Sequence, residues 1–353
     1  MKHLVIKIIA LIIFSSPFLS CEADDVTTPP PMLCDNAQIY ALSTTDPYSG
    51  LSNLDSNGAT ESLAWSASAT IVPGGLGTAI TNSSTSTYNF DNESYHYYNF
   101  QSQEFININS SATFNNVTLS GGSINYNYNG ITYVSGLGKY FILGVDVSGT
   151  ITNGTIGLFE ILNIDTGVIA SSPAATITSY VVPAGMEILF LEYISIATDN
   201  NDMVYAVSQS DIFSFDLSSG TSLHAVLPPA TSGVALTYLG LEFSNNWNTL
   251  VAISYSYSGP EIKLVEINPI LLTLTNTSIN LNSSIPNFYM DYYSTTLSCD
   301  EDSYFISTRS ANIDTDFYKI DINSGVLSIA PGSITATNET GNYYFGLESN
   351  GNN

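Results

Sequence analysis

The chain has 353 residues and a formal net charge of −25, because 31 Asp and Glu residues face only 6 Lys and Arg. Binding to a nucleic-acid backbone depends on Lys and Arg, and so does electrostatic attachment to anionic lipid, so this composition argues against both functions. Tyr, Thr, Ser, Asn and Val are abundant, and no stretch keeps a 3.6-residue apolar period over three turns. These features predict an all-β protein.

The first residues have the layout of a secretory signal peptide over 1–20. Lys2 and Lys7 precede an apolar run at 8–14, and small residues lead up to Cys21. The apolar run is shorter than the roughly 20 residues that span a bilayer. A buried strand and a membrane helix are the alternatives, and the charged, Pro-rich sequence that follows argues against both.

The residues around the predicted cleavage point carry a resemblance. Leu19-Ser20-Cys21 resembles a lipobox, which implies that Cys21 becomes the acylated N-terminus, and Glu22–Asp25 resembles the surface-export signal of Bacteroidota lipoproteins. The resemblance implies an outer-membrane lipoprotein exposed at the cell surface, with the choice of leaflet left open. Two or more acyl chains anchor a protein stably. We expect a Pro-rich tether over 21–36 and a folded domain over 37–353.

A short turn pattern recurs along that domain. Alternating strands end in turns rich in Asp, Asn, Ser and Gly, and the last residues of these turns are Gly58, Ser111, Gly167, Gly220, Leu272 and Gly325. The successive spacings are therefore 53, 56, 53, 52 and 53 residues. Four antiparallel strands repeated at this period are typical of a β-propeller. The spacing predicts six blades.

The clearest unit has strands at 237–243, 250–255, 262–267 and 272–277. It resembles the repeats of bacterial extracytoplasmic propellers, a fold shared by many functions. Residues 343–350 copy its first strand and residues 38–42 its second. We therefore expect the N- and C-termini to complete one four-stranded blade together, which hides sheet edges. A two-sheet sandwich or a pair of Ig-like domains is the competing architecture, and the even spacing and complementary ends favour the propeller.

Two further cysteines follow Cys21. Cys34 precedes the first strand, and Cys299 falls in a turn between the first and second strands of a blade. The propeller places both on the same face of adjacent blades, where an oxidising compartment favours a Cys34–Cys299 disulfide. The alternative is two unrelated thiols. A metal site needs more Cys and His ligands than the chain offers.

No catalytic residues are predicted. His96 and His224 are the histidines that follow Cys21, nothing in the sequence sets a serine elbow or paired acid beside either one, and the Gly-X-Ser-X-Gly pattern is absent. The sequence therefore favours a protein without enzymatic activity.

Acidic residues supply the candidate sites. The predicted first strands carry Glu192, Glu242, Asp291 and Glu348. The first strand of a propeller blade is innermost, so these carboxylates would line the central channel and could hold a cation. Asp314 and Asp316 follow Arg309, the only arginine, in a predicted loop. Carboxylates of this kind suit Ca²⁺, and Arg309 could contact a ligand; the competing interpretation is a surface ion pair.

Two further acidic runs, at 199–202 and 300–302, are interpreted as ordinary hairpin turns. We expect no resident cofactor, and calcium is the one ion that these acids suggest.

Three functions remain open. The leading hypothesis is a monomeric, non-enzymatic binding module for a glycan, a peptide or an envelope partner, held to the membrane by its lipid alone. The second is a hydrolase or lyase with a divalent cation in the central channel, and the third is a structural envelope component. Acids that converge in the channel favour the second hypothesis over the first. A concave aromatic pocket favours the first over the third.

Overall fold

The computed structural model describes residues 38–45, 48–54, 60–67, 86–111, 113–123, 125–148, 153–183, 185–228, 236–256, 261–282, 284–285, 288, 293–309, 315–322, 334–339 and 343–349. The chain divides into two compact units, Met1–Leu33 and Cys34–Asn353, and all described residues belong to the second. The predicted signal peptide, Cys21, the predicted tether and Cys34 lie outside the described residues. Their predicted roles stay predictions.

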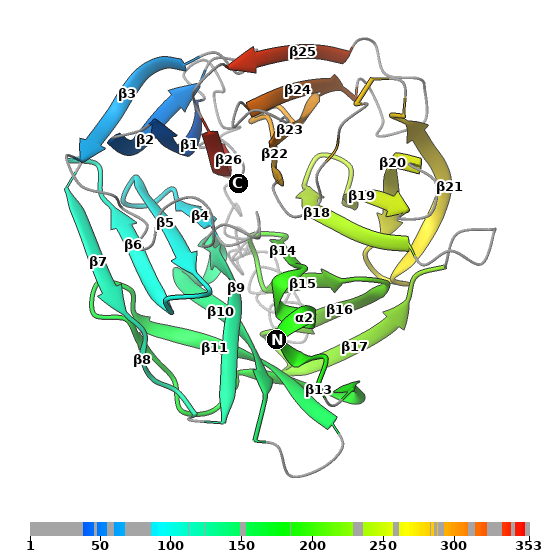
Figure 1. Cartoon of the computed structure of the whole chain (residues 1–353). Helices are drawn as coiled ribbons and strands as arrows, with labels where there is room; N and C mark the ends of the chain where they lie inside the picture. The colour runs from blue at the N-terminus through cyan, green and yellow to red at the C-terminus, as the bar shows by residue number, and fades with distance from the viewer. Residues whose placement is uncertain are drawn as a thin grey trace, which may run out of the picture. The chain divides into compact units, whose positions relative to one another are not determined.

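The second unit is an all-β, six-bladed propeller, as the repeat predicts (Figure 1). The main strands of each blade pair antiparallel, and the first strand of each blade lies innermost. The blade that joins the termini contains β26 (Tyr343–Ser349), β1 (Ile39–Thr45), β2 (Tyr48–Leu54) and β3 (Thr60–Ala67). The next blade contains β4 (Ser86–Asn89), β5 (Ser94–Asn99), β6 (Glu104–Ile108) and β7 (Phe114–Thr118).

The last three blades have the same simple order. They are β14 (Ile194–Thr198), β15 (Met203–Ser208), β16 (Asp211–Asp216) and β17 (Thr221–Val226); β18 (Leu236–Ser244), β19 (Thr249–Ser256), β20 (Glu261–Asn268) and β21 (Thr273–Asn280); and β22 (Tyr293–Leu297), β23 (Ser303–Arg309), β24 (Thr315–Asp321) and β25 (Ile334–Glu339).

The blade between β7 and β14 departs from this order. It contains β9 (Tyr126–Val134), β10 (Lys139–Asp146) and the long β11 (Asn153–Asn163), which pairs with both β12 (Val168–Ile169) and β13 (Ala175–Pro183). The two-residue β8 (Ser120–Gly121) adds to β12 in parallel. The fourth strand position is therefore shared by two segments.

The two ends of the chain meet in one blade. β26 pairs antiparallel with β1, and Ser349 lies opposite Ile39 while Tyr343 lies opposite Thr44. This confirms the predicted closing blade. Main-chain hydrogen bonds then tie the first described strand to the last, so neither strand presents that edge to solvent.

The predicted strand assignment fails at one of the candidate acids. Glu192 is the last residue of a short helix, α2 (Glu187–Glu192), instead of a residue on an innermost strand, and β14 begins two residues later. Leu and Glu are good helix formers. Phe190 and Leu191 are buried whereas Ile188 is 55 % exposed, so the segment is one-sided in the manner of a helix.

The apolar core is divided among the junctions between blades. The described residues form six clusters, and each joins side chains from two neighbouring blades. Stacked rings reinforce two junctions, with ring centroids 5.4 Å apart for Tyr40 and Tyr88 and 5.6 Å apart for Tyr205 and Phe243. Apolar burial between sheets is therefore what holds the ring together. No described helix is both long and apolar enough to cross a membrane.

Candidate functional site

A cavity lies at one end of the central channel, among all six innermost strands. Residues of β4, β9, β14, β18, β22 and β26 line it, together with Phe90 and Asn200 from the turns that follow β4 and β14. Its volume is about 90 Å³, which is room for several water molecules. These innermost strands are seen around the centre of Figure 1.

Two glutamates from different blades face this cavity. Glu242 on β18 and Glu348 on β26 both end a Gly-Leu-Glu sequence. Thr295 Oγ1 of the following blade donates to Glu242 Oε1 at 2.9 Å. In the same way, Ser86 Oγ donates to Glu348 Oε1 at 2.7 Å. The same structural unit therefore occurs twice in the ring and delivers one carboxyl group each time.

The glycine of each Gly-Leu-Glu sequence sets this geometry. Gly240 has φ +60° and Gly346 has φ +62°, the left-handed conformation that favours glycine. The hydroxyl of Tyr304 donates to the carbonyl of Gly240, and that of Tyr95 donates to the carbonyl of Gly346 at 2.6 Å. Each tyrosine lies on the second strand of the next blade, so these bonds join neighbouring blades beneath the glutamates.

Burial makes both carboxyl groups weak acids. It raises the pKa of Glu348 to about 8, although hydrogen bonds from Ser86 and from the backbone of Tyr88 oppose the shift. Burial also raises the pKa of Glu242 well above its usual value; the charge of Glu348 adds to the shift and the Thr295 hydrogen bond opposes it. Glu348 therefore ionises first, and its charge then disfavours ionisation of Glu242.

The rest of the cavity wall is aromatic and hydroxylic. Tyr88, Phe90, Tyr133 and Phe243 line it, and no described lining residue is Lys, Arg or His. Thr132 on β9 also lines the cavity and is 5 % exposed. Among the described residues its hydroxyl has no hydrogen-bond partner, so the wall offers one hydroxyl group that a ligand could bond.

Glu192 does not join this pair. Glu192 ends α2, and Asp291 lies outside the described residues. Strand β14 instead contributes Ile196, Ala197 and Thr198 to the wall. The structure thus brings together two of the four predicted channel carboxylates.

The predicted calcium loop is only partly described. Asp314 lies outside the described residues, and so does the side chain of Arg309, the last residue of β23. Asp316 lies within β24, where it is opposite Thr308, so it is a strand residue and not the loop residue that we expected. In the part of the chain that the structure describes, no three Asp, Glu, His or Cys side chains are grouped to hold a metal ion.

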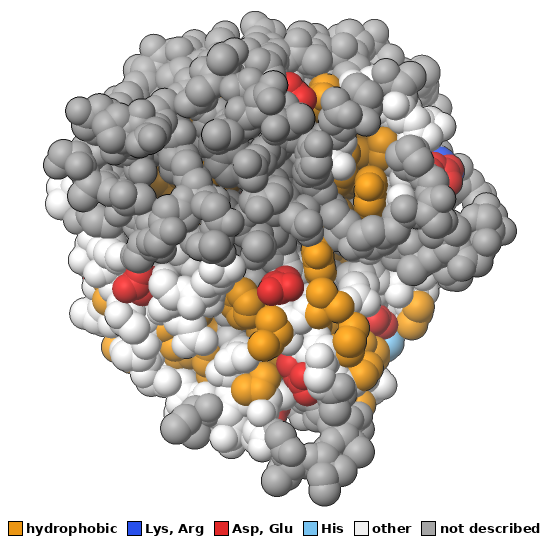
Figure 2. All heavy atoms as spheres, in the orientation of Figure 1, with side chains coloured by type: hydrophobic (Ala, Val, Ile, Leu, Met, Phe, Trp, Pro, Cys, Tyr) orange, Lys and Arg blue, Asp and Glu red, His pale blue; other side chains and the backbone are white. Residues whose placement is uncertain are grey.

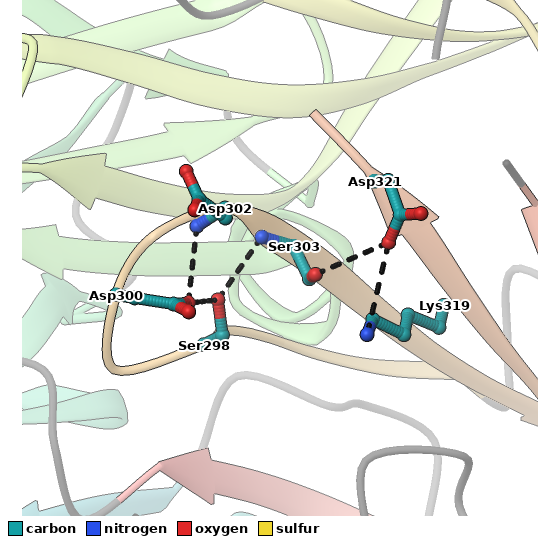
Figure 3. Close-up of polar contacts among 6 residues, drawn as sticks. All are labelled: Ser298, Asp300, Asp302, Ser303, Lys319 and Asp321. Carbon is teal, nitrogen blue, oxygen red and sulfur yellow. Dashed lines mark hydrogen bonds and ion pairs between the residues drawn. The ribbon is translucent and has the colours of Figure 1, made fainter. Parts of the chain in front are cut away.

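The acidic turns adopt ordinary hairpin chemistry. Asp199 Oδ1 accepts hydrogen bonds from the backbone of Asn201, Asp202 and Met203. Figure 3 shows the second turn, where Asp300 Oδ1 accepts from Ser298 Oγ at 2.6 Å and from the backbone of Asp302 at 3.2 Å. In the same view Lys319 forms an ion pair with Asp321, with Nζ 3.7 Å from Oδ1. These carboxylates cap turns and pair with neighbours, which explains their positions without a ligand.

Cys299 belongs to the turn between β22 and β23, as predicted, and it is disulfide-bonded. The other two cysteines of the chain, Cys21 and Cys34, lie outside the described residues. The pairing of Cys299 with Cys34 therefore stays a prediction.

His96 has a polar network that the sequence analysis missed. Its Nε2 lies 2.7 Å from Ser94 Oγ and 2.8 Å from the Tyr140 hydroxyl, and its Nδ1 lies 2.9 Å from Asn107 Oδ1. The spacing of Ser94 and His96 could have revealed the contact, because residues i and i+2 share a face of a strand. Ser94, His96 and Asn107 are each at most 4 % exposed. A buried network of this kind stabilises a blade junction and is closed to substrate.

His224 pairs with an acid on the outer part of its blade. Its Nε2 lies 2.8 Å from Asp211 Oδ1, and Tyr180 donates to the other oxygen of Asp211 at 3.1 Å. No described serine bonds to this histidine, so the arrangement does not form a Ser-His-Asp site.

Exposed apolar side chains accompany α2. Met186 is 37 % exposed and Ile188 is 55 % exposed. Figure 2 shows apolar side chains gathered over the region in which Figure 1 places α2. Nothing in the structure indicates what would cover this surface.

Comparisons with known proteins indicate the fold alone. No protein-family model matches the chain, and no curated protein sequence is significantly similar to it. A chain of a nidogen/laminin complex is similar in structure, with a TM-score of 0.51, 11% identity, and coverage of 89% of this chain and 98% of that chain. A protein from Lactobacillus plantarum has a TM-score of 0.47 and 11% identity, with 84% of each chain covered. A luciferin-regenerating enzyme has a TM-score of 0.42 and 8% identity, with 72% and 76% covered.

Proposed function

We propose that this protein is a non-enzymatic binding module of the bacterial cell surface whose ligand enters the channel cavity. The observation that carries the proposal is the cavity itself, where two carboxyl groups, an unpaired threonine hydroxyl and four aromatic side chains converge from four blades. Concave sites that combine apolar walls with a few convergent polar groups are the usual form of ligand sites.

A steric block of the cavity tests this function. Ile196 lines the cavity, so Ile196→Trp would fill it, whereas Ile188→Trp places the same side chain on exposed surface and serves as the control. We would screen blocked amino acids, small amines, monosaccharides and divalent cations against residues 22–353 by calorimetry and thermal melting. At least one probe should bind the wild type and Ile188→Trp but not Ile196→Trp. If no probe binds, or if Ile196→Trp binds as well as the wild type, the cavity is not the ligand site.

The proposed location rests on the lipobox-like Leu19-Ser20-Cys21 and the acidic Glu22–Asp25. Growth of a bacterium that expresses the full chain with a labelled fatty acid should label the protein, and Cys21→Ser should abolish the label. Proteinase added to intact cells should degrade the wild type, while replacement of the acidic residues at 22, 24 and 25 by Ala should protect it. A labelled Cys21→Ser protein would contradict lipidation at this cysteine.

The second candidate function is a hydrolase or lyase with a divalent cation in the channel. The pairing of Glu242 and Glu348 in one cavity favours it. Calcium takes six to eight oxygen ligands, so hydroxyl groups, backbone carbonyls and water would have to complete the shell. Titration of residues 22–353 with calcium and with magnesium decides the matter: saturable micromolar binding that is lost in Glu242→Gln supports this candidate, and absence of heat removes it.

A further inference from the structure

We propose that the channel cavity recognises a protonated primary amine, such as the ammonium tip of a lysine side chain. This inference rests on the proposed function, since it names the chemical class of the ligand for the same cavity. It follows from four features of the wall: its charge, its hydrogen-bonding capacity, its aromatic rings and its size.

The charge of the wall favours a cation. Glu242 and Glu348 are close enough for the charge of one to disfavour ionisation of the other, and no described residue of the wall is basic. Of the four basic residues after Cys21, the three lysines offer little compensation, because Lys139, Lys263 and Lys319 are each paired with an acid on their own blade. A cation that enters the cavity would favour the ionised form of both carboxyl groups, which their raised pKa values disfavour in its absence.

The hydrogen-bonding groups suit a donor with three N–H bonds. An ammonium group offers three donors and no acceptor. The two carboxyl groups are acceptors, and the Thr132 hydroxyl, which is 5 % exposed and unpaired among the described residues, supplies a third. These three groups come from β26, β18 and β9, so they surround the cavity from different sides of the ring.

The aromatic residues distinguish an ammonium ion from a metal ion. Tyr88, Phe90, Tyr133 and Phe243 line the same cavity. Aromatic rings attract ammonium groups and pack against the methylene stem that carries them. A calcium ion requires more oxygen ligands, and the described residues contain no group of three metal-ligating side chains.

The size of the cavity limits the ligand. An apolar cavity of about 150 Å³ holds benzene, and this one has a volume of about 90 Å³. The space therefore fits an ammonium group with a few methylenes, and it excludes a hexose ring. The rest of a larger ligand would lie outside the cavity.

The test uses four probes on residues 22–353: n-butylamine, its uncharged analogue n-butanol, Nα-acetyl-lysine N-methylamide and calcium chloride. The two amines should bind saturably with dissociation constants of roughly millimolar or tighter, as expected for ligands this small. Butanol should not bind at the same concentrations. Binding of butylamine without the blocked lysine would identify a free small amine as the ligand in place of a lysine side chain.

Substitutions then assign the binding to these residues. Glu242→Gln and Glu348→Gln preserve shape and should each weaken amine binding about tenfold or more, since each removes a charge-assisted hydrogen bond. Thr132→Val should weaken it severalfold. Glu104→Gln, on β6 and outside the cavity wall, is the matched control and should leave binding unchanged. Melting curves of all four variants show whether each is folded.

The pH dependence supplies an independent measurement. An ammonium ion prefers ionised carboxylates, and the pKa of Glu348 is raised to about 8. Affinity should therefore rise from pH 6 to about pH 9 and fall near pH 10.4, where an alkylamine loses its proton. The other titratable groups near the pair are four tyrosines and two acids: Tyr88 and Tyr133 in the wall, Tyr95 and Tyr304 behind the glutamates, and Asp91 and Glu93 beyond Tyr133 and Tyr88. Burial raises the pKa of all four tyrosines, so the tyrosines stay neutral in this pH range.

Each failure has its own signature. Equal binding of butanol and butylamine, or unchanged amine binding in both Gln variants, would overturn the amine inference. Calcium binding without amine binding would replace it with a metal site. If a different probe binds the wild type but not Ile196→Trp, the proposed function stands and the amine inference is wrong. If Ile196→Trp changes nothing, both are wrong.

Discussion

The hydroxyl of Tyr304 donates a hydrogen bond to the backbone carbonyl of Gly240 in the preceding blade. Tyr95 makes the same bond to Gly346, which lies in the closing blade, the blade that precedes that of Tyr95. Both glycines have a positive φ and precede a channel glutamate by two residues. The two joints therefore link blade packing directly to the position of the two carboxyl groups.

Substitution of Gly346 tests the joint. A Cβ on this residue would collide with the Tyr95 hydroxyl and would stand 3.2 Å from Ser86 Cβ. Backbone strain and the collision together should lower the free energy of unfolding of Gly346→Ala by about 3 kcal/mol in urea denaturation.

The matched control is Gly220→Ala. Gly220 has φ +69°, but no described atom lies within 4 Å of the position that a Cβ would occupy, so this variant should lose only the strain energy of about 1 kcal/mol. Adding Tyr95→Phe to Gly346→Ala removes the colliding hydroxyl, and the double variant should be less destabilised than the sum of the single variants. Additive losses would show that the tyrosine does not constrain this glycine.

Glu348 should make the protein less stable as the pH rises. Its pKa is raised in the folded state to about 8 from an ordinary value of 4.5, so the folded protein holds this proton more tightly than the unfolded chain. The stabilisation is complete below pH 4.5 and is lost as the pH rises toward 8, with a slope of at most about 1.4 kcal/mol per pH unit. Urea denaturation from pH 4.5 to 8 should show this loss in the wild type and a flatter profile in Glu348→Gln. Parallel profiles for the two proteins would contradict the raised pKa.

His96 should act in the opposite direction. Burial lowers its pKa from 6.5 to about 4, although the hydrogen bond with Asn107 opposes the shift. The folded state therefore resists protonation, and the stability that is present above pH 6.5 is lost as the pH falls toward 4. The contribution of Glu348 to stability increases over part of that range as the pH falls. The informative quantity is therefore the difference in free energy of unfolding between the wild type and His96→Gln. The difference should shrink as the pH falls; a constant difference from pH 7 to 4 would mean that His96 protonates freely.

The disulfide at Cys299 predicts a specific partner. Residues 22–353 contain two cysteines, Cys34 and Cys299, and Cys299 is disulfide-bonded. Peptic digestion without reductant should yield a peptide pair that joins them. Cys34→Ser, Cys299→Ser and the double variant should lose the same stability, of order 4 kcal/mol for so long a loop. A disulfide-linked dimer in place of the internal peptide pair would show that the bond joins two chains.

The blade architecture could be predicted from the sequence because its signal is local. Each repeated turn, such as the one ending at Gly220, connects the third and fourth strands of a blade, and its Asp, Ser and Gly residues follow from hairpin geometry alone. The complementary ends also predicted the closing blade. The sequence of β1 has the pattern of a second strand with no first strand before it, and that of β26 has the pattern of a first strand with no second strand after it. The repeat period and the turn residues can be read from residues that are close in the sequence, so these elements could be predicted.

The cavity was only partly predictable because its wall is assembled across the ring. Glu242 and Glu348 could be predicted from their repeated Gly-Leu-Glu sequence, but Glu192 lacks a glycine two residues before it and lies on a helix. A glycine two residues before the acid is therefore the sequence signal that distinguishes the two channel glutamates from Glu192. Thr132 could not be predicted, because its unpaired hydroxyl depends on which blades meet at the channel, and no short-range pattern records this.

Glu301 provides the last test, at the junction between the final two blades. Glu301 is 4 % exposed, and its carboxylate accepts hydrogen bonds from Ser244 Oγ at 2.5 Å and from the backbone of Asn245 and Asn246 at 3.0 and 2.9 Å. Glu301→Ala would leave these donors without their acceptor, and a buried donor without a partner costs about 1–3 kcal/mol. We therefore expect a loss of about 3 kcal/mol or more in urea denaturation, with faster hydrogen exchange confined to the turns after β18 and β22. Glu301→Gln keeps one acceptor oxygen and should lose less, and Asp300→Asn, at an exposed position of the same turn, should be nearly neutral. Equal losses for Asp300→Asn and Glu301→Ala would mean that the turn as a whole, and not this buried carboxylate, joins the two blades.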